Sequence, residues 1–240
     1  MLQTMLEVKP ARAQSLLSLN IPSVDGLFPG FAPGDFALLH GSPSVTSLTS
    51  LLCVRAQLPV QLGGLDGNVI FIDCGNTFAP DSITRLAQLN HLNATQARKH
   101  IFNFGAFTAY QLTSLIMEKL EKKIVTCNAK LVVISDIASL FLDKDIQNEE
   151  AQRVYSQIVN CLSNLTKKHQ IIVVATHLPH EDSIRNSVLR EITLTKATTV
   201  LSYFKTKYTR ELNLEKHPTY ILGTAEPPSE NLTLTDFIGT

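Results

Sequence analysis

The chain of 240 residues contains 44% hydrophobic and 18% charged residues, which is typical of a globular domain large enough to bury a complete core. This composition excludes an intrinsically disordered chain and a coiled coil. Lys and Arg total 21, as do Asp and Glu, so the net charge is zero and no global field draws the protein to nucleic acid or to an anionic membrane. Any contact with DNA must therefore come from a local patch.

The cysteines and the N-terminal residues indicate the cellular compartment. Four cysteines lie far apart without a C-x-x-C pair, so we expect reduced, mostly buried thiols. They are Cys53, Cys74, Cys127 and Cys161. The first residues lack the pattern of a signal peptide, and no apolar run reaches the length of a membrane span. We expect an intracellular protein, cytoplasmic or nucleoid-associated, or nuclear in a eukaryote.

Short apolar runs alternate with amphipathic segments, which is typical of a parallel sheet flanked by helices. Four runs are apolar on both faces, as strands covered by helices on both sides must be. These are 36–40, 69–73, 131–135 and 171–176, and a shorter fifth run is 101–104. Helices are predicted over 80–90, 108–122 and 147–168.

After residue 179 the pattern changes to short β-prone runs separated by charged or Pro-containing breaks. The runs are 198–203, 208–214 and 219–222, and they predict a terminal β-meander that closes the sheet. The sequence has no repeat or linker that would mark a second domain. We therefore expect a short leader over 1–15 and one core domain over 16–240.

The first predicted strand leads into a loop and a Leu-rich helix, the arrangement that cradles phosphate at a helix N-terminus. A phosphate loop has the pattern Gly-x-x-x-x-Gly-Lys-Ser/Thr, in which the lysine contacts phosphates and the hydroxyl binds magnesium. Only its first glycine, Gly41, is present. Thr46 stands at the second glycine, Ser47 at the lysine and Leu48 at the hydroxyl. Taken alone, this Gly-Ser-Pro-Ser loop is more typical of a structural turn than of a nucleotide site.

The segment 57–80 resembles the core of RecA/RadA-type recombinases, especially their archaeal and eukaryotic branch. That family has Gln-Leu-Pro, a Gly-Gly-x-x-Gly turn, a strand ending in Ile-Asp-Thr-Glu-Gly-Thr-Phe, and then Arg-Pro. The matching residues, in the same order, are Gln57, Leu58, Pro59, Gly63, Gly64, Gly67, Ile72, Asp73, Thr77, Phe78 and Pro80. A weaker resemblance extends from residue 16 to residue 225. It implies an α/β fold, the RecA-like P-loop NTPase core, with a mostly parallel sheet flanked by helices.

The resemblance also implies where the ATPase residues would stand, and each position is changed. The glutamate that activates water matches Gly75, which cannot act as a base. The Walker B aspartate matches Ser135. Asp136 follows one residue later, where strand alternation points its carboxylate away from the metal unless the strand end bends. The glutamine that senses the γ-phosphate matches His177, which we interpret as a hydrogen-bonded structural residue. We therefore expect no metal site, no productive binding of ATP or magnesium, and no ATPase activity.

The family binds DNA through two mobile loops, and the second follows the strand 171–176. Here the interval 179–195 lacks the family's Gly-rich, basic character. Further on, cations are interleaved with aromatic residues, a composition that suits single-stranded nucleic acid. The candidate DNA contacts are Lys196, Lys205, Lys207 and Arg210, interleaved with Tyr203, Phe204 and Tyr208. The alternative is a β-hairpin with solvated lysines and core aromatics.

The family polymerises through a Phe-x-x-Ala tether that precedes the core and docks on the neighbouring subunit as an added strand. No Phe in this sequence is followed by Ala three residues later, and we expect no helical N-terminal domain. The resemblance favours a non-catalytic paralogue, an accessory in homologous recombination and DNA repair that binds a RadA-type recombinase or another paralogue. Two alternatives remain open. One is a residual ATPase completed at a subunit interface, and the other is a regulator related to KaiC-like or archaellum-motor proteins.

Overall fold

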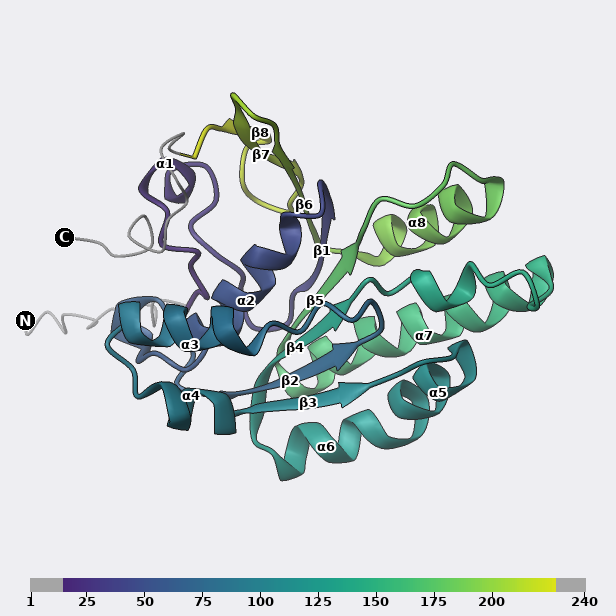
Figure 1. The fold of residues 1–240 in the computed structure, drawn as a ribbon, viewed down its shortest axis with the longest axis horizontal. Coiled ribbons are helices and arrows are strands. Elements are labelled where there is room, and N and C mark those ends of the chain that lie inside the picture. The colour runs from purple at the N-terminus through teal and green to yellow at the C-terminus, as the bar shows by residue number, and fades with distance from the viewer. Residues whose placement is uncertain (1–14, 228–240) are drawn as a thin grey trace, which may run out of the picture.

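The computed structural model describes residues 15–227, which are built around one twisted sheet (Figure 1). Its strand order is β3-β2-β4-β5-β1-β6-β7-β8. The strands from β3 to β6 are parallel, and β7 and β8 run antiparallel. The bounds are β1 Phe36–Gly41, β2 Asn68–Asp73, β3 Ile101–Gly105, β4 Ala129–Ser135, β5 Ile172–His177, β6 Thr199–Lys205, β7 Arg210–Lys216 and β8 Gly223–Ala225. Most of the predicted leader, residues 1–14, and the end of the predicted core, 228–240, lie outside the described residues.

Helices cover both faces of the sheet (Figure 1). One face carries α1 (Pro22–Asp25), α2 (Val45–Arg55), α3 (Pro80–Leu89) and α4 (Ala94–Lys99). The other carries α5 (Ala109–Ser114), a π-helical turn (Leu115–Lys119), α6 (Leu120–Thr126), α7 (Asn148–His169) and α8 (Ile184–Lys196). Two 3₁₀ turns, Val60–Leu62 and Ser139–Phe141, lie in connections.

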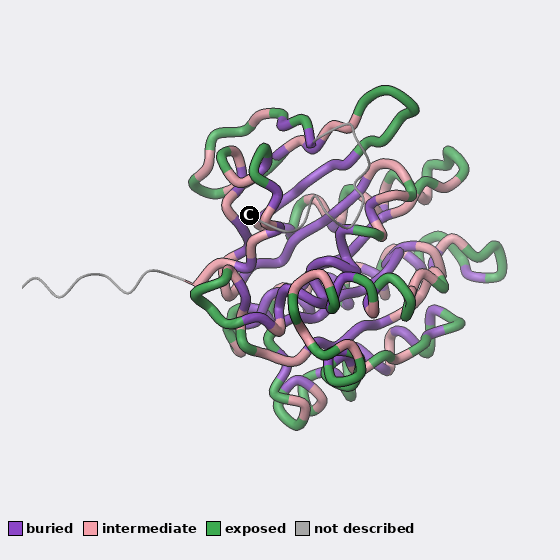
Figure 2. The backbone as a smooth tube through the Cα atoms, turned by 60° about the vertical axis from the view of Figure 1, so that its left-hand side comes forward, coloured by how far each residue is buried: buried purple, intermediate pink, exposed green. Residues whose placement is uncertain are grey.

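The central strands are buried on both sides, which explains their continuous apolar runs. Val69 and Phe71 pack under α2 and α3, whereas Ile70 and Ile72 pack under α5 to α7. This alternation follows from the period of two along a strand. Figure 2 shows the result, with buried residues running along the middle of the sheet. The five apolar runs predicted from the sequence are confirmed as β1 to β5.

The predicted meander is confirmed as antiparallel, but its third strand was wrongly placed. The run 219–222 is a turn, and the strand is β8, which begins at Gly223. His217 decides this, because its Nδ1 accepts hydrogen bonds from the N–H groups of Thr219 and Tyr220 at 3.1 and 3.0 Å. The His217 ring also stacks on Tyr220, with ring centroids 4.1 Å apart. These contacts close a turn where β propensity alone predicts a strand.

The interval 179–195, which stands at the position of the family's second DNA-binding loop, is mostly helix. Helix α8 begins at Ile184 behind the N-cap Ser183, whose side chain accepts from the N–H of Asn186. Only residues 178–183 remain as a loop between β5 and α8. Helix α4 was also missed, although Asn93 caps it in the same way.

The four cysteines are free, as expected, but only Cys53 is fully buried and the other three are half-buried. "Mostly buried" was therefore wrong, because three of the thiols lie at the margins of the core. Within residues 15–227, no helix combines the length and apolar character needed to cross a membrane.

Candidate functional site

The loop at the phosphate-loop position is short and bonded to the neighbouring strand. Strand β1 ends at Gly41 and α2 begins at Val45, so three residues connect them. Gly41 has φ +119°, and a Cβ there would lie 2.3 Å from the carbonyl oxygen of Tyr203 on β6. The Ser42 hydroxyl donates to that same oxygen at 3.2 Å and accepts from the N–H of Lys205 at 3.2 Å. Gly41 is therefore required by the close approach of β6.

The first amides of α2 are already bonded within the chain. The N–H groups of Val45, Thr46 and Ser47 donate to the carbonyls of residues 42, 43 and 44 at 3.0, 3.2 and 3.0 Å. The hydroxyls of Thr46 and Ser47 donate to the carbonyls of residues 43 and 44 at 2.9 and 2.6 Å. Leu48 is buried in the core. The donors that face phosphate in a phosphate loop are thus directed at the loop itself.

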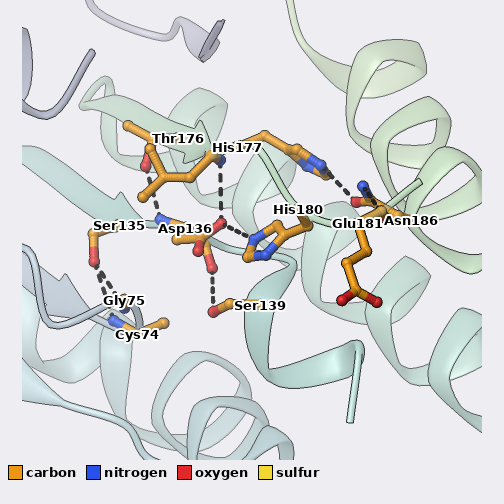
Figure 3. A network of polar contacts seen from close by, with 11 residues as sticks. Cys74, Gly75, Ser135, Asp136, Ser139, Thr176, His177, His180, Glu181 and Asn186 are labelled. Carbon is orange, nitrogen blue, oxygen red and sulfur yellow. Dashed lines mark hydrogen bonds and ion pairs between the residues drawn. The ribbon is translucent and has the colours of Figure 1, made fainter. Parts of the chain in front are cut away.

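Ser135, which the resemblance places at the Walker B position, belongs to a network that fixes a turn (Figure 3). Its hydroxyl donates to Asp73 Oδ1 at 2.8 Å and accepts from the N–H groups of Cys74 and Gly75 at 3.1 and 3.3 Å. Asp73 in turn accepts from the N–H groups of Thr77 and residue 78 at 2.9 and 3.1 Å. The network holds the turn after β2. Gly75 in this turn leaves room for Asp136, because a Cβ at residue 75 would lie 3.0 Å from the Cβ of Asp136.

Asp136 turns out of the strand direction and toward the segment that follows β5. Its φ is +48°, so the chain bends at the end of β4. The buried carboxylate accepts from the N–H of Leu178 at 3.2 Å and pairs with His180 Nε2 at 2.9 Å (Figure 3). The bend therefore brings the Asp136 carboxylate to the loop that follows β5, where its hydrogen bonds are made.

His177 ends β5 and contacts the first turn of α8. Its Nε2 lies 2.8 Å from Asn186 Oδ1, so the ring donates through Nε2 and leaves Nδ1 as a bare acceptor. That Nδ1 is buried and has no hydrogen-bond partner among the described residues. Burial lowers the pKa of His177, against the opposing effect of the hydrogen bond to Asn186.

A cavity of about 480 Å³ lies between α8 and the β6–β7 hairpin, at the carboxyl ends of β1 and β5. Among the residues that line it are His40, His177, His180, Asn186, Arg190 and Glu215. His40 Nε2 lies 2.8 Å from Glu215 Oε2, and Arg190 Nη2 lies 3.4 Å from His40 Nδ1. Within residues 15–227, no three His, Cys, Asp or Glu side chains are placed to hold a metal ion.

The two buried histidines predict a loss of stability in mild acid. Burial lowers the pKa of both His40 and His177 below the ordinary value of 6.5, so between the two values the unfolded chain binds more protons than the folded one. The contribution of the two neutral histidines to the free energy of unfolding is complete above pH 6.5. It is lost as the pH falls through the pKa of the folded state. The slope is at most about 1.4 kcal/mol per pH unit for each histidine. Urea denaturation at pH 7.5 and 5.5 should show that His177→Gln loses less free energy of unfolding than the wild type when the pH is lowered. An equal loss in both proteins would contradict a lowered pKa for His177.

The candidate DNA contacts fall into two places. Lys205, Lys207 and Arg210 lie at the tip of the β6–β7 hairpin, where Lys207 Nζ stands 5.5 Å from the ring centroid of the exposed Tyr208. Lys196 ends α8 and precedes β6, at the opposite end of that strand. Of the interleaved aromatics, Phe204 and Tyr208 are exposed, whereas Tyr203 is buried in the core.

Comparison with known proteins shows the family of this chain. Relatives include the meiotic recombination proteins named DMC1 homolog A of Oryza sativa subsp. japonica and DMC1 homolog of Lilium longiflorum, each 29% identical over 137 residues. Another is the meiotic recombination protein DLH1 of Candida albicans, 29% identical over 140 residues. These alignments cover 57% of this chain but 39%, 39% and 43% of the relatives, so the chain spans about two fifths of their length. The Rad51 family model matches residues 39–188, from the end of β1 into α8, and with that match over more than half of its length the chain belongs to the Rad51 family.

Proposed function

We propose that this chain is a non-catalytic member of its family, a pseudo-ATPase that acts as an accessory in homologous recombination and DNA repair. In this role it binds a Rad51-type recombinase or another paralogue. The closed loop between β1 and α2 carries the proposal. Its amides and hydroxyls are bonded to its own carbonyls, and residues 46–48 supply no lysine for phosphate and no hydroxyl for magnesium. These residues do not fit a magnesium nucleotide.

The missing charges support the same conclusion. A triphosphate loses its principal ion partner when Ser47 replaces the lysine, and its magnesium ion loses the Walker B carboxylate when Ser135 replaces the aspartate. Asp136 does not compensate, because its carboxylate accepts from Leu178 and His180. Gly75 in place of the glutamate removes the group that would activate water.

An open sheet edge supports the proposed partner contact. Strand β3 is the outermost strand and pairs only with β2 among the described strands. The carbonyl of His100 accepts from β2 and the N–H of Ala106 donates to β2, so even-numbered residues face the ladder. Backbone groups alternate along a strand, so Ile101, Asn103 and Gly105 direct theirs to the free edge. A partner segment can add there as a strand.

A groove beside this edge provides apolar and cationic contacts for such a segment. It has a volume of about 700 Å³, and Phe107 and Tyr110 at its margin are 81% and 62% exposed. Lys123 lies over the Phe104 ring at 3.8 Å, and Lys119 also lines the groove. Exposed aromatic side chains beside unpaired backbone groups are typical of a protein interface.

Replacing one edge residue should separate partner binding from folding. Asn103→Pro removes an outward N–H without removing a bond to β2, so we expect it to weaken binding of the full-length recombinase of the same source by about tenfold or more, equivalent to about 1.4 kcal/mol. Asn103→Ala keeps the N–H and should bind nearly as the wild type does. Isothermal titration calorimetry measures both, with and without single-stranded DNA, for which the β6–β7 hairpin tip is the proposed contact.

Three outcomes would overturn parts of the proposal. Absence of binding to the recombinase in every state would rule out the recombinase as the direct partner. Equal binding by Asn103→Pro and Asn103→Ala would move the contact away from β3. Tight binding of Mg-ATP by the purified chain, or ATP turnover with the partner that Asp136→Ala abolishes, would favour a residual ATPase completed at the interface.

A further inference from the structure

Two loops leave the sheet side by side at the carboxyl ends of the neighbouring strands β4 and β5. The first loop, residues 136–147, leads to α7, and the second loop, residues 178–183, leads to α8. Their bases are joined by Thr176, whose hydroxyl accepts from the N–H of Asp136 at 2.7 Å and whose carbonyl accepts from the N–H of Ile137 at 2.9 Å. The loops therefore start from one rigid base.

Asp136 ties the first loop to the second by its side chain and shapes the first loop by its backbone. Its Oδ1 contacts the N–H of Leu178 and His180 Nε2, both in the second loop (Figure 3). Its carbonyl accepts from the N–H and the hydroxyl of Ser139 at 3.0 and 2.8 Å, which starts the 3₁₀ turn. One buried residue thus fixes the near ends of both loops.

Arg185, in the first turn of α8, holds the far end of the first loop. Its guanidinium donates to the carbonyls of Phe141, Asp143 and Ile146 at 3.3, 2.5 and 2.7 Å. It also donates to the side chain of Asn148 at 2.6 Å. These four hydrogen bonds come from a charged group with a fixed fork of donors, which makes them stronger than neutral ones. Opening the first loop would leave three main-chain carbonyls to find other donors.

The second loop is closed across its own base. His177 before it contacts Asn186 after it, and the N–H of Asn186 donates to Ser183 Oγ at 3.1 Å. Asn186 Nδ2 also contacts the carbonyl of Glu181 at 3.5 Å. In the recombinases that this chain resembles, the position of His177 and the position next to Asp136 handle nucleotide. Here both side chains instead hold loops in place.

We propose that Asp136 and Arg185 are positioning residues that hold both loops in one fixed arrangement without nucleotide. The contacts run from the strand ends to the first turn of α8 and need no phosphate or metal to complete them. This inference rests on the proposed function, because a chain that binds no ATP must fix its loops with its own side chains. The loop face that a partner meets is then the same at every nucleotide concentration.

Hydrogen–deuterium exchange of the full chain tests this inference. In the wild type, the hydrogen-bonded amides of the first loop and the amide of Leu178 in the second should exchange slowly, and at the same rate with and without millimolar Mg-ATP. Arg185→Gln should speed exchange in residues 141–148 by about tenfold or more, because the four hydrogen bonds from the guanidinium to that segment are lost. Asp136→Gly should do the same for the amide of Leu178, which donates to the Asp136 carboxylate, since glycine adopts φ +48° and removes only that carboxylate.

Matched controls separate a local effect from general loosening. Arg153→Gln removes an exposed arginine on α7, and Asp145→Ala removes an exposed acid within the first loop, and neither should change exchange in the loops. Amides of β2 and β4 should stay protected in every variant. Loop exchange that slows tenfold on adding Mg-ATP to the wild type would overturn the inference, as would wild-type protection in both variants. Hydrogen–deuterium exchange of the loops does not depend on recombinase binding. Failure of the proposed partner contact would therefore appear in the calorimetry and leave the loop exchange unchanged.

Discussion

Replacing Gly41 by alanine should lower the free energy of unfolding by about 3 kcal/mol or more. Two effects add. The backbone at Gly41 has φ +119°, which L-residues with a Cβ rarely adopt, and the new Cβ would lie 2.3 Å from the carbonyl oxygen of Tyr203. That oxygen belongs to β6 and accepts from the Ser42 N–H and hydroxyl, so it cannot withdraw without breaking the loop. Urea denaturation followed by circular dichroism gives the change.

Gly26→Ala is the matched control, because no atom lies within 4 Å of the position of its Cβ and its φ is −69°. Its stability should stay within about 0.5 kcal/mol of the wild type or rise slightly. Comparable stability of the Gly41 and Gly26 variants would show that the β6 backbone can move away from a Cβ at residue 41 at little cost in free energy. It would remove the structural reason for the one phosphate-loop residue that the chain retains.

Arg55→Leu should destabilise the fold by about 3 kcal/mol. Arg55 is 3% exposed and donates to the carbonyls of Ser18 and Leu62, both at 2.6 Å, and to Asn90 Oδ1 at 3.4 Å. It thereby joins the segment before α1, the turn after α2 and the end of α3. Leucine fills part of the space but removes all three hydrogen bonds from the charged guanidinium, and a hydrogen bond to a charged group contributes about 1.5–3 kcal/mol.

Two further variants show whether hydrogen bonding or charge is responsible. Arg55→Lys keeps the charge but replaces the fork by a single ammonium group, so an intermediate loss is expected. Arg85→Ala, at an exposed position on α3, should change the free energy of unfolding by less than about 0.5 kcal/mol. If Arg55→Leu is as stable as Arg85→Ala, the Arg55 contacts do not hold these segments together.

The segment that reveals the family by sequence has a structural explanation in Arg55. Gly63 follows Leu62, whose carbonyl binds Arg55, and it has φ +73°; a Cβ there would lie 3.0 Å from Arg55 Nη2. A Cβ at Gly64 would lie 2.1 Å from the carbonyl oxygen of Leu58. The two glycines are therefore required by the tight turn around the buried Arg55 guanidinium. They carry information about the fold and none about catalysis.

The polar network at the strand ends could not be predicted from the sequence. His180 and Arg185 were not singled out, because their partners lie 44 and between 37 and 44 residues away and no short spacing marks such contacts. Asp136 was singled out only as a displaced Walker B carboxylate. Its direction depends on a backbone φ of +48° after β4, which strand alternation does not predict.

The sequence by itself determined strands β1 to β7, helices α2, α3 and α5 to α7, and the family resemblance, because apolar periodicity and tight-turn glycines are local consequences of burial and backbone geometry. The resemblance also predicts which charged residues are missing at the nucleotide positions. Only the tertiary structure decided where the remaining polar groups point. The closed amides of α2, the outward backbone groups of β3 and the contacts of Asp136 and Arg185 depend on distant segments meeting. The pairing of a buried polar group is set by whichever partner the fold brings within hydrogen-bond distance.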